Sequence, residues 1–156
     1  ACYLEEKKDK IRLLAIAKAS SSLPYVCPIT YVDGRPMLDG GIVDSIPVER
    51  AISQGYERNV VVLTRNRGYR KDEKDIRVPR FVYKRYPRLR VVLSNRCKAY
   101  NQQLEMVERM EDEGRIVVIR PERPVVVNRI ERDIKKLTAL YEEGYACAEK
   151  VFSSFE

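Results

Sequence analysis

Two uninterrupted apolar runs constrain the fold of this chain more than any other feature. They occupy residues 59–64 (NVVVLT) and 116–119 (IVVI), and neither run alternates apolar with polar residues. Runs of this kind are typical of strands covered on both faces, as in a parallel sheet with helices above and below it. Segments of helical character separate the two runs, so we expect an α/β architecture.

Apolar residues at helical spacing place the helices. Tyr100, Leu104 and Val107 predict a helix that ends at Gly114. Pro47 fits the first turn of a shorter helix. A final helix is predicted by apolar residues spaced three or four positions apart, namely Ile134, Leu137, Tyr141, Tyr145, Ala148 and Phe152.

The opening part of the chain adds a helix and a hairpin. Residues 4–18 predict a helix with Ile11, Leu14 and Ala15 on its inner face. Asp33-Gly34 is a hairpin signal that follows a short β-branched stretch. One hairpin and two buried-type runs are few strands, because a mean sheet has roughly five or six. We therefore expect an exposed sheet edge and self-association of the chain.

The sequence MLDGGIVDSIPV at residues 37–48 joins an apolar strand to a helix through two glycines. Gly40 and Gly41 can adopt backbone angles closed to other residues, so we expect a tight turn that leaves Asp39 projecting into open space. A carboxylate held in this way can accept a hydrogen bond from a neighbouring group. An Asp-Gly pair is also an ordinary turn signal, and we expect Asp44 or Ser45 to cap the following helix.

Composition excludes several kinds of site. The chain has no histidine, so its own residues cannot assemble a Ser-His-Asp or Cys-His arrangement. Its cysteines, at positions 2, 27, 97 and 147, form no C-x-x-C pair, and we expect free thiols, no metal and no cofactor. No apolar run approaches the roughly 20 residues of a membrane-spanning helix. We expect a cytoplasmic location, either free or at the periphery of the membrane.

Residues 19–24 read ASSSLP, Pro28 follows, and residues 38–41 read LDGG before Pro47. In order and spacing they resemble the A-S-x-x-x-P segment and the D-G-[GA] turn of the patatin-like phospholipase family. The resemblance runs from about residue 15 to residue 65 and is closest to the bacterial branch, in which a basic helical extension follows the core.

This resemblance implies a domain organisation. Residues 1–65 would be the C-terminal part of an α/β hydrolase domain with a three-layer parallel-sheet fold, and they would carry the catalytic aspartate. Residues 66–156 would form a basic connector and a mainly helical C-terminal extension with one strand.

The resemblance also implies a serine–aspartate dyad, which needs no histidine. Asp39 matches the dyad aspartate, which accepts the proton of the serine nucleophile, and Gly40 and Gly41 shape its turn. The G-x-S-x-G motif that carries the serine does not occur in these 156 residues. We therefore expect the C-terminal part of a longer enzyme, inactive alone, whose parent hydrolyses carboxylic esters of lipids or phospholipids. The serines at 20–22 would have a structural role.

Positive charge is concentrated in the middle of the chain. The net charge is +7, and residues 65–98 hold 13 basic but only 3 acidic side chains, with four aromatic residues among them. Such a segment fits an exposed connector, an anionic membrane surface or single-stranded nucleic acid. We favour nucleic acid least, because no recognised nucleic-acid motif accompanies the charges. A non-catalytic binding module that uses this segment for nucleic acid or an acidic partner is the alternative to the hydrolase.

Overall fold

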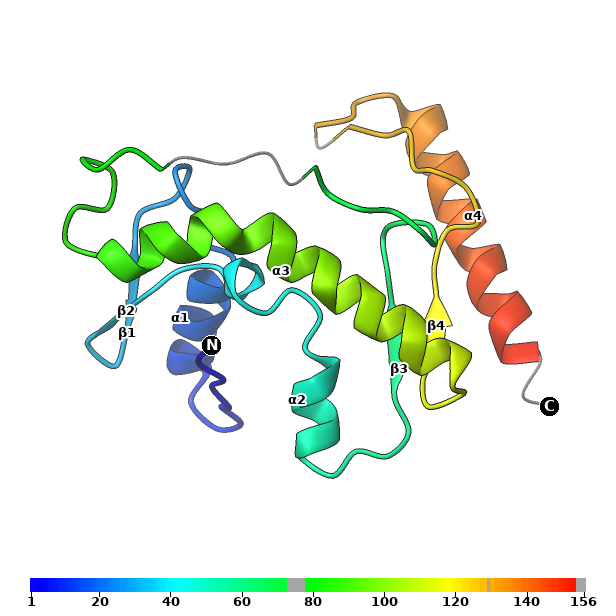
Figure 1. Cartoon of the computed structure of the whole chain (residues 1–156), viewed down its shortest axis with the longest axis horizontal. Coiled ribbons are helices and arrows are strands. Elements are labelled where there is room, and N and C mark those ends of the chain that lie inside the picture. The colour runs from blue at the N-terminus through cyan, green and yellow to red at the C-terminus, as the bar shows by residue number, and fades with distance from the viewer. Residues whose placement is uncertain (73–77, 129, 154–156) are drawn as a thin grey trace. The chain divides into compact units, whose positions relative to one another are not determined.

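The computed structural model describes residues 1–72, 78–128 and 130–153, and Figure 1 shows the order of the elements. The chain forms two compact units. The first contains Ala1–Pro47 and Lys71–Gln103, and the second contains Val48–Arg70 and Leu104–Glu156. Each unit has its own group of buried apolar side chains, with Val32 and Leu93 in the first and Val107 and Ile116 in the second.

The first helix, α1 (Lys10–Ser20), begins later than the sequence predicts. The Asp9 carboxylate caps it by accepting hydrogen bonds from the amides of Ile11 at 2.9 Å and Arg12 at 3.0 Å. The predicted inner face is wrong, because Ile11 and Leu14 are 82% and 70% exposed. The helix instead buries Ala19, near the end that precedes the hairpin.

The hairpin is confirmed. Strands β1 (Thr30–Val32) and β2 (Arg35–Met37) pair antiparallel beside α1 (Figure 1). Asp33 and Gly34 have φ angles of 50° and 72°, which suits the two-residue turn that matches the twist of the strands. Arg12 of α1 forms an ion pair with Asp33 at 2.8 Å and holds the pKa of that carboxyl below its usual value.

The long helix α3 (Pro87–Asp112) confirms the helix predicted around Leu104 and Val107, which are 3% and 0% exposed. It begins earlier than the periodic residues suggest, because part of the basic segment is helical. Pro87 is its first residue, where a missing amide proton costs nothing. Gly114, with a φ of 69°, lies just beyond its end.

In the second unit, α2 (Val48–Ser53) leads to strand β3 (Val60–Val62), which pairs in parallel with β4 (Val117–Ile119). The parallel pairing confirms the two predicted strands, and helices mixed with small sheets are consistent with the α/β class. The expectation that β3 is covered on both faces is wrong, because Val60 and Val62 are 51% and 69% exposed while Val61 is buried. The three-layer sheet stays a prediction.

The last helix, α4 (Ile134–Phe152), has the bounds that its periodic residues predict, and it lies beside β4 (Figure 1). Its periodic stripe, however, is largely exposed, with Ile134 at 76% and Tyr141 at 71%. The less exposed residues of α4 include Leu140 and Cys147, on an adjacent face of the helix. The spacing therefore identifies the helix correctly but does not identify the residues that pack.

Candidate functional site

Asp39 lies at a short 3₁₀ turn, Gly40–Ile42, directly after β2. The Asp39 carboxylate caps this turn, since its Oδ1 atom accepts a hydrogen bond from the Gly41 amide at 2.7 Å. The buried side chain of Ile42 anchors the other end of the turn. The carboxylate is thus held in one orientation by its own turn.

The two glycines of this turn do not serve as the sequence suggests. Neither Gly40 nor Gly41 has a positive φ angle, so the expectation that they need unusual backbone angles is wrong. A Cβ atom at position 41 would lie 2.9 Å from Oδ1 of Asp39, whereas a Cβ atom at position 40 would meet nothing within 4 Å. Position 41 therefore needs a glycine because any side chain there would crowd the Asp39 carboxylate.

The serine-rich segment at residues 19–24 is hydrogen-bonded to the Asp39 turn. The amide of Asp39 donates a hydrogen bond to the carbonyl of Ser22 at 2.9 Å. The buried hydroxyl of Ser22 contacts the carbonyl of Lys18 and the hydroxyl of Thr30, both at 2.8 Å. The hydrogen bond between Asp39 and Ser22 thus joins the turn to the end of α1, across 17 positions in sequence.

The prediction that Asp44 or Ser45 caps α2 is wrong, because the side chains of both residues have other partners. The Asp44 carboxylate accepts hydrogen bonds from the hydroxyl of Tyr3 and, at 2.6 Å, from the side-chain amide of Gln103. The Ser45 hydroxyl donates to the carbonyl of Gly41 at 2.7 Å. Gln103 also accepts a hydrogen bond from the Ser45 amide at 3.1 Å, so it fixes the segment that follows the Asp39 turn. No local sequence signal marks Gln103.

A cavity of about 440 Å³ lies beside the turn. Leu38, Gly40 and Asp44 line it, together with residues from α1 and the first four residues of the chain. The neighbours of Asp39 on both sides thus belong to the cavity wall, but Asp39 itself does not. Asp39 is half-buried, and in the ranges that the structure describes it forms no ion pair.

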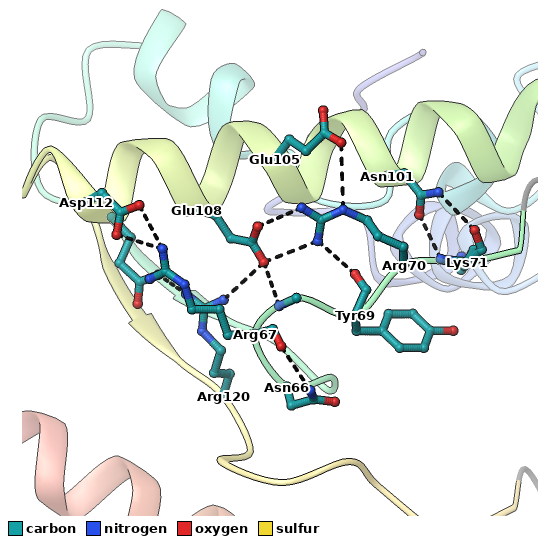
Figure 2. A network of polar contacts seen from close by, with 12 residues as sticks. Asn66, Arg67, Tyr69, Arg70, Lys71, Asn101, Glu105, Glu108, Asp112 and Arg120 are labelled. Atoms are coloured by element: carbon teal, nitrogen blue, oxygen red, sulfur yellow. Dashed lines mark hydrogen bonds and ion pairs between the residues drawn. The ribbon is translucent and has the colours of Figure 1, made fainter.

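In the second unit, a network of charges holds the loop before residue 71 against α3 (Figure 2). Glu108 accepts hydrogen bonds from Arg70 at 2.7 Å and from the Gly68 amide at 2.9 Å. The hydrogen bonds from Arg70, followed by the Gly68 amide, lower the pKa of Glu108 to about 2. Arg67 binds Asp112 at 2.7 Å (Figure 2). Sequence reasoning did not identify this network.

The network reduces the charge that the basic segment presents to a partner. Arg67 and Arg70 are both paired with carboxylates of α3. Lys74 and Arg77 lie outside the described residues. Exposed cations remain around the turn that holds Phe81, namely Arg80, Lys84, Arg85 and Arg88. Phe81 itself is 81% exposed.

Within residues 1–72, 78–128 and 130–153, no helix is both long enough and apolar enough to cross a membrane.

Comparison with known families gives two matches. Residues 3–52 match the patatin-like phospholipase family, and residues 86–156 match a domain of unknown function (DUF6363). No curated protein matches the chain. The first match contains α1, the serine-rich segment, the hairpin and the Asp39 turn, so it covers both motifs on which the resemblance rests. Residues 3–52 of the chain are therefore similar to the patatin-like phospholipase family.

Proposed function

We propose that this chain supplies the aspartate of a serine–aspartate acyl hydrolase that cleaves carboxylic esters of lipids or phospholipids. Asp39 is the general base in this proposal, and the nucleophilic serine belongs to a segment with a G-x-S-x-G motif, which the 156 residues do not contain. In the same proposal, the segment that carries the serine completes a three-layer patatin-like sheet together with this chain.

The observation that carries the proposal is the orientation of the Asp39 carboxylate. Its Oδ1 atom is occupied by the Gly41 amide, and its backbone amide is bound to Ser22. Among the residues that the structure describes, no partner binds Oδ2. A carboxylate with one fixed oxygen and one free oxygen can accept the proton of a serine hydroxyl, and the serine can then attack the ester carbonyl to form an acyl-enzyme.

Ser21 and Ser22, which lie close to the turn in sequence and structure, do not replace the missing nucleophile in this proposal. The Ser22 hydroxyl is buried between Lys18 and Thr30, and the Ser21 hydroxyl donates to the carbonyl of Ala17 at 2.9 Å. Both hydroxyls therefore act in the structure of the α1 terminus. We accordingly expect the purified chain to be inactive toward p-nitrophenyl esters.

Reconstitution tests the proposal. The chain is combined, as a second polypeptide or in a fusion, with a patatin-like segment that carries the G-x-S-x-G serine. Hydrolysis of p-nitrophenyl butyrate and labelling of the serine by a fluorophosphonate should then require both parts. Hydrolysis by the 156 residues alone, or full activity of the serine segment without them, would contradict the proposal.

We also propose that the exposed turn around Phe81 brings the enzyme to anionic lipid surfaces. Arg80, Lys84 and Arg85 are all exposed beside this aromatic side chain. A cluster of cations with an exposed ring is suited to the headgroup region of a membrane. Self-association of the chain, expected from its short sheets, stays a separate prediction, and sedimentation over a range of protein concentrations tests it.

Vesicle binding tests the lipid surface. Lys84→Gln combined with Arg85→Gln should weaken binding to phosphatidylserine-containing vesicles about thirtyfold, since each cation contributes about 1 kcal/mol. Arg58→Gln combined with Arg123→Gln is the matched control, because it removes two exposed cations outside residues 65–98. Equal weakening in both variants, or salt-sensitive binding to single-stranded nucleic acid without vesicle binding, would favour the binding-module alternative.

A further inference from the structure

A second cavity, of about 360 Å³, lies entirely within the second unit. Its walls come from the last residues of β3 and β4 and the residues just after them, from the loop at 125–128 and from α4. Because β3 and β4 are parallel, their carboxyl ends meet at one edge of the sheet. Open α/β sheets bind their ligands outside this edge, so the cavity occupies the position at which a ligand is expected.

The wall is aliphatic along most of its surface. Its apolar side chains include Val62, Leu63, Ile119, Val125, Val127 and Leu140. In the part of the chain that the structure describes, the wall holds neither an aromatic ring nor a carboxylate. The volume falls in the range of small-molecule sites, which are mostly apolar with a few polar groups that fix the orientation of the ligand. An aliphatic ligand body matches this wall better than a polar or stacked ring.

Two arginines supply charge at the wall. Arg120 is already paired with Glu111 and Glu108. Arg65 differs, because its guanidinium lies 5.0 Å from the centroid of the Tyr69 ring and no carboxylate of the described residues pairs with it. The cavity thus combines an aliphatic wall with one arginine, Arg65, for which the described residues supply no carboxylate partner.

We propose that this cavity binds a single saturated medium-chain fatty acid, with the acyl chain against the aliphatic wall and the carboxylate at Arg65. The site shares no residue with the Asp39 turn and needs no ester hydrolysis, so the inference goes beyond the proposed function. It assigns a ligand to the region that includes part of the match to a domain of unknown function at residues 86–156.

Gly144 provides a direct test. It lines the cavity from α4, and a Cβ atom added there would meet nothing within 4 Å. The Cβ atom of Gly144→Leu therefore meets no neighbour, and we expect the longer side chain to reduce the volume of the cavity. Leucine also favours a helix more than glycine does. Ala146→Leu is the matched control, because Ala146 is exposed, lies two positions away on the same helix and does not line the cavity.

Binding of decanoate to the full chain, measured by calorimetry below the micelle concentration, gives the readout. Gly144→Leu should weaken binding at least tenfold, while Ala146→Leu should leave it within about twofold. Wild-type affinity in the Gly144→Leu variant, no binding by the wild type, or equal losses in both variants would overturn the inference.

Two further readouts locate the ligand. Arg65→Gln should weaken decanoate about tenfold and leave decanol unchanged, because a charge-assisted hydrogen bond is lost only for the acid. Decanoate should also slow alkylation of Cys147, which lines the cavity, but not that of exposed Cys2. Equal affinity of Arg65→Gln and wild type for decanoate, or an unprotected Cys147 at saturation, would contradict the assignment.

Discussion

In the reconstituted hydrolase, the substitution Gly41→Ala should lower kcat for ester hydrolysis by displacing the Asp39 carboxylate. The added methyl group would lie 2.9 Å from Oδ1, and ordinary contacts begin near 3.4 Å, so the carboxylate must move by about 0.5 Å. The same movement lengthens the 2.7 Å hydrogen bond to the residue 41 amide. Because a catalytic group misplaced by 1 Å can cost about 10²-fold in rate, we expect kcat to fall about tenfold.

Gly40→Ala is the matched control for this experiment, since a Cβ atom at position 40 meets nothing within 4 Å. In the reconstituted hydrolase, its kcat for p-nitrophenyl butyrate should stay within about twofold of wild type. Thermal unfolding of both variants is the control that tests whether the fold is kept. Equal kcat values for Gly41→Ala and Gly40→Ala would refute the idea that position 41 must leave space for the Asp39 carboxylate.

Two further predictions concern stability. Glu108 has its pKa lowered to about 2 by Arg70, so its contribution to the free energy of unfolding is complete above pH 4.5 and is lost as the pH falls toward 2. Glu108→Gln should remove this contribution, which solvent screening reduces to about 1–3 kcal/mol, and Glu105→Gln should keep it, as acid unfolding monitored by circular dichroism would show. Ser22→Ala should lower the free energy of unfolding by about 1–3 kcal/mol, because a buried hydrogen-bond partner is left unsatisfied. Ser21→Ala, at an exposed hydroxyl, should cost less than about 1 kcal/mol, and equal losses in urea unfolding would contradict this reasoning.

Periodicity predicts the elements of this fold well, because helix and strand geometry is local. The helix Ile134–Phe152, the hairpin turn at Asp33-Gly34 and the parallel pair β3–β4 all follow from spacing and turn chemistry. Burial is less predictable, since it depends on which segments cover each face. Ile11 and Leu14 therefore lie on an exposed face of α1 although their spacing predicts an inner one.

The candidate site shows the same division between local and long-range information. The motif around Asp39 identifies the carboxylate and its turn, because both are encoded in neighbouring residues. The contact of Asp44 with Gln103 joins positions 59 residues apart, and that of Arg67 with Asp112 joins positions 45 apart. Partners at such separations carry no local signal, and the role of Gly41 becomes visible only from the distance to Oδ1.

The most direct test of the account compares Asp39→Asn with Asp44→Asn in the reconstituted hydrolase. Both variants remove a carboxylate from the same segment. Among the described residues, both oxygens of Asp44 have hydrogen-bond partners, whereas Oδ2 of Asp39 has none. We expect Asp39→Asn to lower kcat by about 10²–10⁴-fold, because a general base is lost, and Asp44→Asn to have a much smaller effect. Wild-type kcat in Asp39→Asn, or a larger loss in Asp44→Asn, would contradict this expectation.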